Sequence, residues 1–189
     1  MKQLIFAVLI GFMTSSFSTS ENLCITPEER DLYNLLMDYR KQKNLPAIPL
    51  SYSLSKVAKL HVYDLVHNKP TSTKCNLHSW SDKGVWKSCC YTSDHKQADG
   101  MWSKPQEISQ YKSAGFEIAA YFGNGATARG AIANWKKSAG HNEVMINQGS
   151  WKKMNWQAVG VGIEGNYAVI WFGAEQDPDQ TKLETCDKI

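Results

Sequence analysis

Three short stretches of the sequence place side chains that bind metals or transfer protons among small or aromatic neighbours. They are His78-Ser79-Trp80-Ser81, Gly115-Phe116-Glu117-Ile118-Ala119 and Gly140-His141-Asn142-Glu143. Imidazole and carboxylate groups from distant parts of a chain make a site only when the fold brings them together. His78, Glu117 and His141 are therefore the candidate residues of such a site, with Glu143 as a further candidate.

Two neutral imidazoles and one carboxylate are typical of an open Zn²⁺ site, with water in the remaining position. In that interpretation His78 and His141 are metal ligands, and the metal activates water for hydrolysis. In the alternative interpretation both histidines are hydrogen-bonded residues that hold loops in place. Glu117 lies in the middle of a strand pattern, where a buried carboxylate needs a partner. His78 or His141 is the natural partner.

Other residues have weaker claims to a site. His61 and His67 are six residues apart on a predicted helix and do not share one face of it, and His95 lies in a predicted loop. No Gly-x-Ser-x-Gly motif occurs, which gives no support to a serine hydrolase of that type. A platform for carbohydrate or lipid is an alternative use of the tryptophans at 80, 86, 102, 151 and 156.

The first half of the chain predicts two helices followed by a long loop. Thr26-Pro27-Glu28-Glu29 has the residues of a capping box, which predicts a helix from there to about Asn44. Ser53 is expected to begin a second helix that ends before Pro70. From 71 to 110 no periodicity is present, which indicates a disulfide-braced functional loop.

The second half of the chain is richer in strands. We expect a strand over 116–122, a helix from Thr127 to Ser138, a strand over 144–146, and a hairpin of 157–164 and 167–172 around Gly165-Asn166. Helices first and strands last predict an α+β fold, with helices packed against a mainly antiparallel sheet.

The first twenty residues have the pattern of a secretory signal peptide. Lys2 precedes an apolar run over 4–13 and a small, polar stretch over 15–20. The apolar run is shorter than the about 20 residues that a bilayer span needs. We predict a secreted, extracellular or periplasmic protein with one domain over 24–189 and no transmembrane segment. A lipid anchor on Cys24 is an alternative, in a poor sequence context.

The balance of charge predicts no nucleic-acid partner. Lys and Arg number 21, against 18 Asp and Glu, which is too small a surplus to indicate binding to nucleic acid or an anionic membrane.

Export makes disulfide bonds the default for the five cysteines, which are Cys24, Cys75, Cys89, Cys90 and Cys186. Cys89 and Cys90 are adjacent and can hardly share one partner, so we expect Cys75 to pair with one of them. Cys24 and Cys186 are candidates to join the two ends of the domain. A zinc–cysteine site is the alternative, but no Cys-x-x-Cys pair occurs.

Several motifs in this order resemble the CAP superfamily of cysteine-rich secretory proteins, antigen 5 and pathogenesis-related proteins, whose common unit is the SCP domain. The resemblance covers roughly residues 27 to 175 and is closest to exported bacterial members. It rests on the Leu45–Leu50 linker, His78, Gly115–Ala119, Trp135 with Ser138-Ala139-Gly140-His141, Val159–Gly162 and Trp171-Phe172-Gly173.

The resemblance implies an α-β-α sandwich with a large central cleft, faced by two histidines and two acidic residues. His78, Glu117 and His141 match three of these. The second acid has no match, because Trp135-Lys136-Lys137-Ser138 contains no carboxylate. Glu143 would substitute for it only on a regular strand, where residues two apart point to the same side.

The function that the resemblance implies is binding rather than catalysis, with an unknown small ligand, a divalent metal such as Zn²⁺, a lipid or an extracellular protein as partner. One alternative is a metal-dependent, peptidase-like hydrolase that uses the same residues. The other is a lipid- or sterol-binding protein.

Overall fold

The computed structural model describes residues 23–186, so the predicted leader over 1–20 lies outside the described residues. Within residues 23–186, no helix has the length and apolar character needed to cross a membrane. The helices are α1 (Pro27–Gln42), α2 (Tyr52–Tyr63), the π-helix η1 (Asp64–Asn68), α3 (Ala98–Trp102), α4 (Lys104–Ile108), α5 (Ala128–Lys137), α6 (Ala139–Met145) and the 3-10 helix η2 (Gly149–Trp151). The strands are β1 (Gly115–Tyr121), β2 (Ala158–Glu164) and β3 (Tyr167–Gly173).

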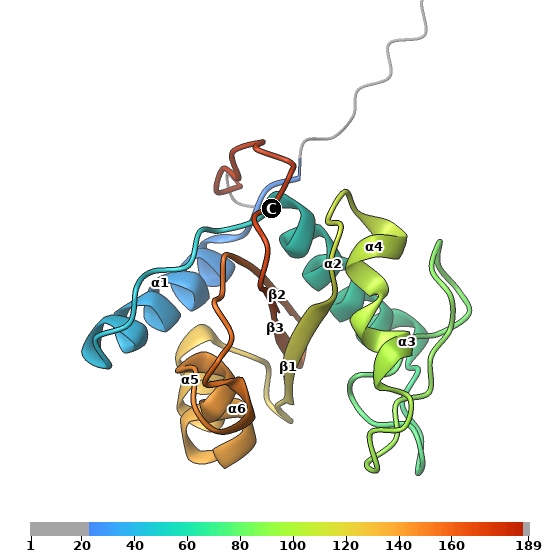
Figure 1. The fold of residues 1–189 in the computed structure, drawn as a ribbon. Helices are drawn as coiled ribbons and strands as arrows, with labels where there is room; N and C mark the ends of the chain where they lie inside the picture. The colour runs from blue at the N-terminus through green and yellow to red at the C-terminus, as the bar shows by residue number, and fades with distance from the viewer. Residues whose placement is uncertain (1–22, 187–189) are drawn as a thin grey trace, which may run out of the picture.

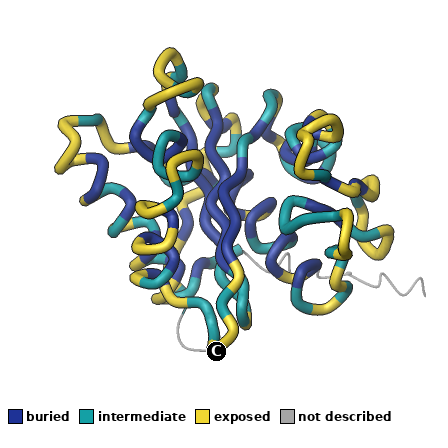
Figure 2. Tube along the Cα trace, turned by 90° about the horizontal axis from the view of Figure 1, so that it is seen from below, coloured by how far each residue is buried: buried dark blue, intermediate teal, exposed yellow. Residues whose placement is uncertain are grey.

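The predicted α+β fold is confirmed, with a three-stranded antiparallel sheet between two layers of helices (Figure 1). The strand order is β1-β3-β2, so the hairpin of β2 and β3 forms around Gly165-Asn166 as expected. Strand β3 lies in the middle, and most of its residues are buried. The burial view shows the same arrangement, with dark central strands and exposed residues at the periphery (Figure 2).

Each face of the sheet has its own apolar core because successive strand residues point to opposite sides. Ile118, Ile170 and Phe172 pack with the helices α1, α5 and α6. Ala119, Val169 and Trp171 pack with α2 and the segments around α3 and α4. Glu117 has the same parity as Ala119, so its carboxylate enters the second of these layers.

Helix α1 begins with the predicted capping box. The side chain of Thr26 accepts from the Glu29 amide, and the Glu29 carboxylate accepts from the Thr26 amide. The same buried carboxylate receives the Lys59 ammonium of α2 at 3.0 Å and the Ile163 amide of β2 at 3.0 Å. Glu29 thus caps α1 and also joins this helix to α2 and to the sheet.

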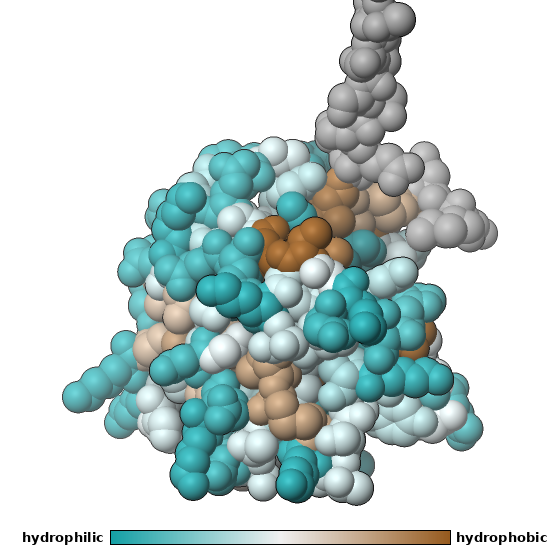
Figure 3. Space-filling model, turned by 90° about the vertical axis from the view of Figure 1, so that its right-hand side faces the viewer, coloured by the Kyte–Doolittle hydropathy of each residue, from teal (hydrophilic) through white to brown (hydrophobic). Residues whose placement is uncertain are grey.

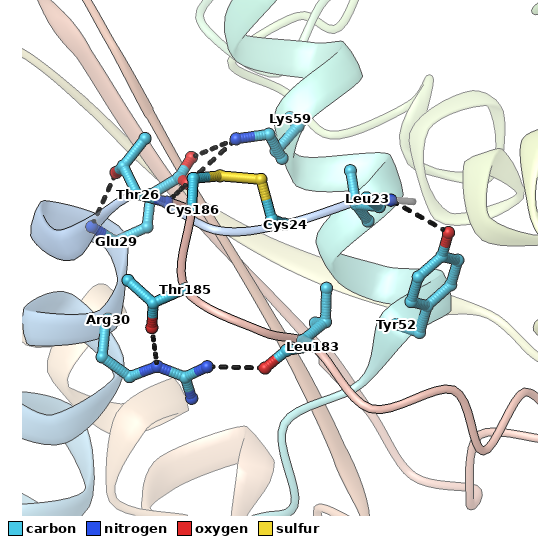
Figure 4. The surroundings of a disulfide bond; sticks show 10 residues. All are labelled: Leu23, Cys24, Thr26, Glu29, Arg30, Tyr52, Lys59, Leu183, Thr185 and Cys186. Atoms are coloured by element: carbon cyan, nitrogen blue, oxygen red, sulfur yellow. Dashed lines mark hydrogen bonds and ion pairs between the residues drawn. A yellow bond between two sulfur atoms is a disulfide. The ribbon is translucent and has the colours of Figure 1, made fainter. Parts of the chain in front are cut away.

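The ends of the described chain are tied together beside this cap (Figure 4). Cys24 pairs with Cys186, and Arg30 donates to the Leu183 carbonyl at 2.7 Å and to the Thr185 hydroxyl at 3.2 Å. The second disulfide joins Cys75 to Cys90. The candidate bond between the two ends is therefore present, and the structure selects Cys90 over Cys89 as the partner of Cys75. Cys89 is the buried free thiol among the described cysteines.

Helix α2 lies very close to β2, and two glycines permit this. A Cβ atom on Gly160 would collide with the backbone of Leu54, and one on Gly162 would lie 2.7 Å from the Ala58 carbonyl oxygen. The cap of α2 is Ser51, whose hydroxyl accepts from the Leu54 amide at 2.9 Å, and not Ser53 as predicted. The cap differs because the Asp177 carboxylate accepts from the Ser51 hydroxyl and the Ser53 amide.

Two further predictions about helices and strands are wrong. The stretch over 71–110 contains the short helices α3 and α4, which lack a long amphipathic repeat and pack against β1 and α2. The predicted strand over 144–146 is instead the end of α6, which begins at Ala139. A run of three apolar residues is too short to distinguish a strand from a buried helical turn.

Candidate functional site

Glu117 is the centre of the candidate site. It pairs with Trp171 in the β1–β3 register, and its side chain is completely buried between the sheet and α2. Histidines from two different segments contact its two carboxylate oxygens. A buried carboxylate is costly unless it is paired and hydrogen-bonded, and here each oxygen has a partner.

The first partner is His61, which comes from the buried face of α2. Its Nδ1 contacts Oε1 of Glu117, and its Nε2 donates to the Ser79 carbonyl oxygen at 3.0 Å. The imidazole is fully buried and stacks on the Trp80 ring, with 4.2 Å between centroids. His61 is thereby held on both nitrogens and on one face.

The partners of His61 fix how many protons this pair holds. A backbone carbonyl only accepts hydrogen bonds, so Nε2 of His61 carries a hydrogen. A second hydrogen must lie between Nδ1 and the Glu117 carboxylate, because two lone pairs would repel each other. The pair therefore holds two hydrogens: one on Nε2 of His61, and one shared between Nδ1 and the Glu117 carboxylate. With both present, the combined charge of His61 and Glu117 is zero.

The second partner is His78, from the loop closed by the Cys75–Cys90 disulfide. Its Nδ1 lies 2.7 Å from Oε2 of Glu117, and its side chain is 18% exposed. Because this oxygen accepts, Nδ1 is the donor, and the neutral ring keeps a lone pair on Nε2. The structure gives that Nε2 atom no hydrogen-bond partner among the described residues.

The rest of the His78-Ser79-Trp80-Ser81 motif anchors the loop. Trp80 forms a two-residue antiparallel bridge with Cys89, and the hydroxyl of Ser79 accepts from the Tyr91 amide at 2.9 Å. The Ser81 amide donates to the buried Asp64 carboxylate of η1 at 2.7 Å. These contacts hold His78 in place although it lies outside any helix or strand.

His141 completes the group from the first turn of α6. Its Nδ1 is buried and has no hydrogen-bond partner among the described residues. Burial lowers the pKa of His141, the charge of His78 lowers it further, and Glu117 acts in the opposite direction. The charged residues that influence its pKa are thus members of the Glu117 group.

The pKa of Glu117 is set by opposing influences. Burial is the largest and raises it, but the charge and hydrogen bond of His61, together with those of His78, outweigh burial and leave the pKa lowered. Glu117 therefore stabilises the fold above the ordinary pKa of a free carboxyl group, and this contribution is lost only as the pH falls through the lowered value.

Glu143 is not brought to this group. His141 and Glu143 both lie on α6, where residues two apart point in different directions. The Glu143 carboxylate instead lies against Gly149, which begins η2. Its expected alignment with His141 required a strand, and the segment is a helix.

Sequence reasoning missed His61. The signal was present, because Leu54, Ala58, His61 and Leu65 follow helical spacing and are all buried. His67, the other histidine of this region, is exposed and pairs with Glu164 at 2.6 Å. A histidine within an apolar stripe requires a buried partner, and Glu117 is that partner.

The donors available to a metal ion are two imidazole nitrogens. Among the described residues no group of three or more His, Cys, Asp or Glu is placed to hold a metal. Glu117 is occupied by His61 and His78 on both oxygens. The described residues therefore do not fit a metal centre with three protein ligands.

A separate groove of about 870 Å³ lies elsewhere on the molecule, and none of its lining residues belongs to the histidine group. It runs beside the C-terminal segment, between the loop over 46–51 and residues 176–185. Its buried carboxylate, Asp177, already accepts from Ser51 and Ser53. The groove and the histidine group are therefore two separate features of the molecule.

The sequence profile of the cysteine-rich secretory protein (CAP) family matches residues 33–168. The chain belongs to the CAP family. The match spans both core layers, from within α1 to within β3, and includes His61, His78, Glu117 and His141. No curated protein matches this CAP-domain chain closely enough to count as a relative.

Two solved structures show that the fold is shared at low sequence identity. An outer surface protein from Borrelia burgdorferi has 19% identity and a TM-score of 0.53, over 77% of this chain and 91% of that one. An extracellular protein containing an SCP domain from Bacillus anthracis has 17% identity and a TM-score of 0.53, over 77% of this chain and 39% of that one. The CAP-domain chain thus spans less than half of the second protein.

The lowered pKa of His141 predicts a pH-dependent stability. In metal-free protein, the unfolded state binds a proton near the ordinary histidine pKa of 6.5, while folded His141 does so only at lower pH. Stability should fall as the pH is lowered through this window, because the unfolded state holds more protons. His141→Gln should show a shallower fall between about pH 7.5 and 5, measured by urea unfolding. Equal slopes for both proteins would contradict this prediction.

Proposed function

We propose that this CAP-domain protein acts by binding, and that its ligand is held between His78 and His141. The observation that carries the proposal is the pair of unused ring nitrogens, Nε2 of His78 and the buried, unpartnered Nδ1 of His141. A buried polar atom without a partner is rare in folded proteins. A ligand that accepts two imidazole lone pairs would satisfy both rings at once.

A divalent transition metal such as Zn²⁺ is the ligand class that these nitrogens favour. Metal-binding histidines usually donate their other ring nitrogen to a carboxylate, which fixes the ring and its tautomer. His78 has this arrangement with Glu117, and His61 holds Glu117 in turn. A metal bound here would offer open coordination positions to a further ligand.

The proposed place of action is outside the cell or in the periplasm. Two disulfides support this, because such bonds persist in oxidising compartments. The structural relatives described as an outer surface protein and an extracellular protein also support it. The predicted leader over 1–20 is part of the same proposal.

The two alternative functions have less support. A hydrolase needs a free acid or base beside the metal, and both oxygens of Glu117 are engaged. A lipid carrier needs a continuous apolar surface or cavity. On the face over α3 and α4, hydrophobic side chains form small separate spots in a hydrophilic surface (Figure 3).

The test is calorimetric titration of Zn²⁺ into metal-stripped protein lacking residues 1–20. We expect saturable binding of about one ion per chain, weaker than a structural zinc site because only two ligands come from the protein. The His78→Ala, His141→Ala double variant should lose it. His67→Ala is the matched control, because His67 is an exposed imidazole paired with a carboxylate outside the site. Binding that survives in the double variant, or no binding at all, would overturn the proposal.

A further inference from the structure

Three lysines from separate segments come together on the surface. Lys43 follows α1, Lys136 lies in the last turn of α5, and Lys152 follows η2. The ammonium of Lys136 lies 3.9 Å from the centre of the Tyr39 ring, and that of Lys43 lies 5.6 Å from the same centre. Lys43 and Lys152 line one hollow of about 460 Å³. We call these three residues the lysine patch.

The lysine patch carries charge without nearby compensation. All three lysines are exposed, and none of them takes part in the ion pairs found among the described residues. Two carboxylates belong to the same elements: Glu143 lies against Gly149, which lines the hollow, and Asp38 is exposed on α1. They leave the surface with a clear excess of positive charge.

A buried cation beneath the hollow adds to this excess. Arg40 is 2% exposed, and its guanidinium donates to the carbonyls of Pro46 and Met145 and to the Asn147 side chain at 2.7–3.0 Å. All three acceptors are neutral. Burial lowers the pKa of Arg40 to about 10, so the group keeps its charge near neutral pH. Asn147 lines the hollow, which connects the buried charge to the lysine patch.

The arrangement favours a linear polyanion over a membrane surface. Lys136, Lys43 and Lys152 follow one another across the ends of α1 and α5, which pack together on the left of Figure 1, and the hollow that follows. The exposed large hydrophobic residues in the described chain are Tyr63, Val85 and Tyr121, and none belongs to the patch. Insertion into lipid therefore has no apolar anchor here.

We propose that the lysine patch binds a sulfated or phosphorylated polysaccharide outside the cell. Strong anionic groups spaced along a chain would pair with successive ammonium groups, and one would enter the hollow above Arg40. This inference is independent of the metal site, because the patch contains none of the residues proposed to bind Zn²⁺.

Heparin, as a model sulfated polysaccharide, provides the test. The affinity of the protein for heparin is measured at several salt concentrations, beside the K43Q/K136Q/K152Q variant. The matched control is K56Q/K74Q/K112Q, which removes the same charge from three exposed lysines outside the patch. Thermal unfolding of each variant verifies that it is folded.

The protein is expected to bind heparin at physiological salt, with an affinity that falls steeply as salt rises. The patch variant should lose at least about tenfold in affinity and about two to three units of the logarithmic salt slope, one for each lost contact. The control should keep both. Equal losses in the two variants would overturn the proposal, as would absence of binding at about 0.15 M salt. Binding to phosphatidylserine vesicles without binding to heparin would also overturn it.

Discussion

Replacing Glu117 by leucine is expected to lower the free energy of unfolding by about 3–5 kcal/mol at neutral pH. The leucine side chain fills the space but leaves the Nδ1 atoms of His61 and His78 without an acceptor. His61 is fully buried, so water cannot replace the lost partner. The same change ends the fixed orientation of His78, so Zn²⁺ affinity should fall as well.

Glu117→Gln separates the loss of charge from the loss of hydrogen bonds. A glutamine side chain at this position can donate to Nδ1 of a neutral His61 and accept from Nδ1 of His78. The loss of stability should then be no more than about 1.5 kcal/mol. A loss as large as that of the leucine variant would mean that the charge of the carboxylate, not its hydrogen bonding, stabilises the site.

The control for both variants is Glu164→Leu. Glu164 also pairs with a histidine, His67, but both side chains are more than a third exposed. An exposed pair contributes at most about 1 kcal/mol, so this substitution should have little effect. Urea unfolding with unchanged slope is the measurement for all three. If Glu117→Leu behaved like Glu164→Leu, the His61–Glu117–His78 arrangement would have no role in stability.

The two disulfides are expected to differ in what their removal changes. Cys24–Cys186 spans 162 residues and Cys75–Cys90 spans 15. Loss of the longer link should cost about 3–5 kcal/mol, and loss of the shorter one about 2–3 kcal/mol, because a longer closed loop restricts the unfolded chain more.

Zn²⁺ affinity should show the opposite order. His78 lies three positions after Cys75, inside the short loop that the Cys75–Cys90 bond closes, whereas Cys24 and Cys186 lie near the ends of the described chain. C75S/C90S should therefore weaken Zn²⁺ binding, and C24S/C186S should leave it nearly unchanged. Both pairs are made in a Cys89→Ser background to prevent thiol exchange with the buried free thiol. Urea unfolding and calorimetric titration measure the two effects. Equal effects of both pairs on Zn²⁺ binding would contradict the assignment of His78 to the site.

The helix starts and the hairpin that the sequence predicted correctly are determined by contacts between residues close together in the chain. The capping box of Thr26 and Glu29 and the Thr127 cap act within one helical turn. The Gly165-Asn166 turn fixes the pairing of β2 with β3 by geometry alone. Adjacency of Cys89 and Cys90 limited the partners of Cys75 before the structure distinguished between them. The order of motifs along the chain was enough to indicate the CAP family.

What only the tertiary structure decided depends on the packing of α2 against the sheet. Gly160 and Gly162 let α2 approach β2 closely, and this places His61 against Glu117, 56 positions away in the sequence. Nothing local to His61 identifies that partner. The same holds for the lysine patch: Lys43 and Lys136 come together because α1 packs on α5, and Lys152 lines the same hollow as Lys43. Residue types and helix starts are local properties of the sequence, whereas shared protons and clustered charges arise from contacts between distant segments.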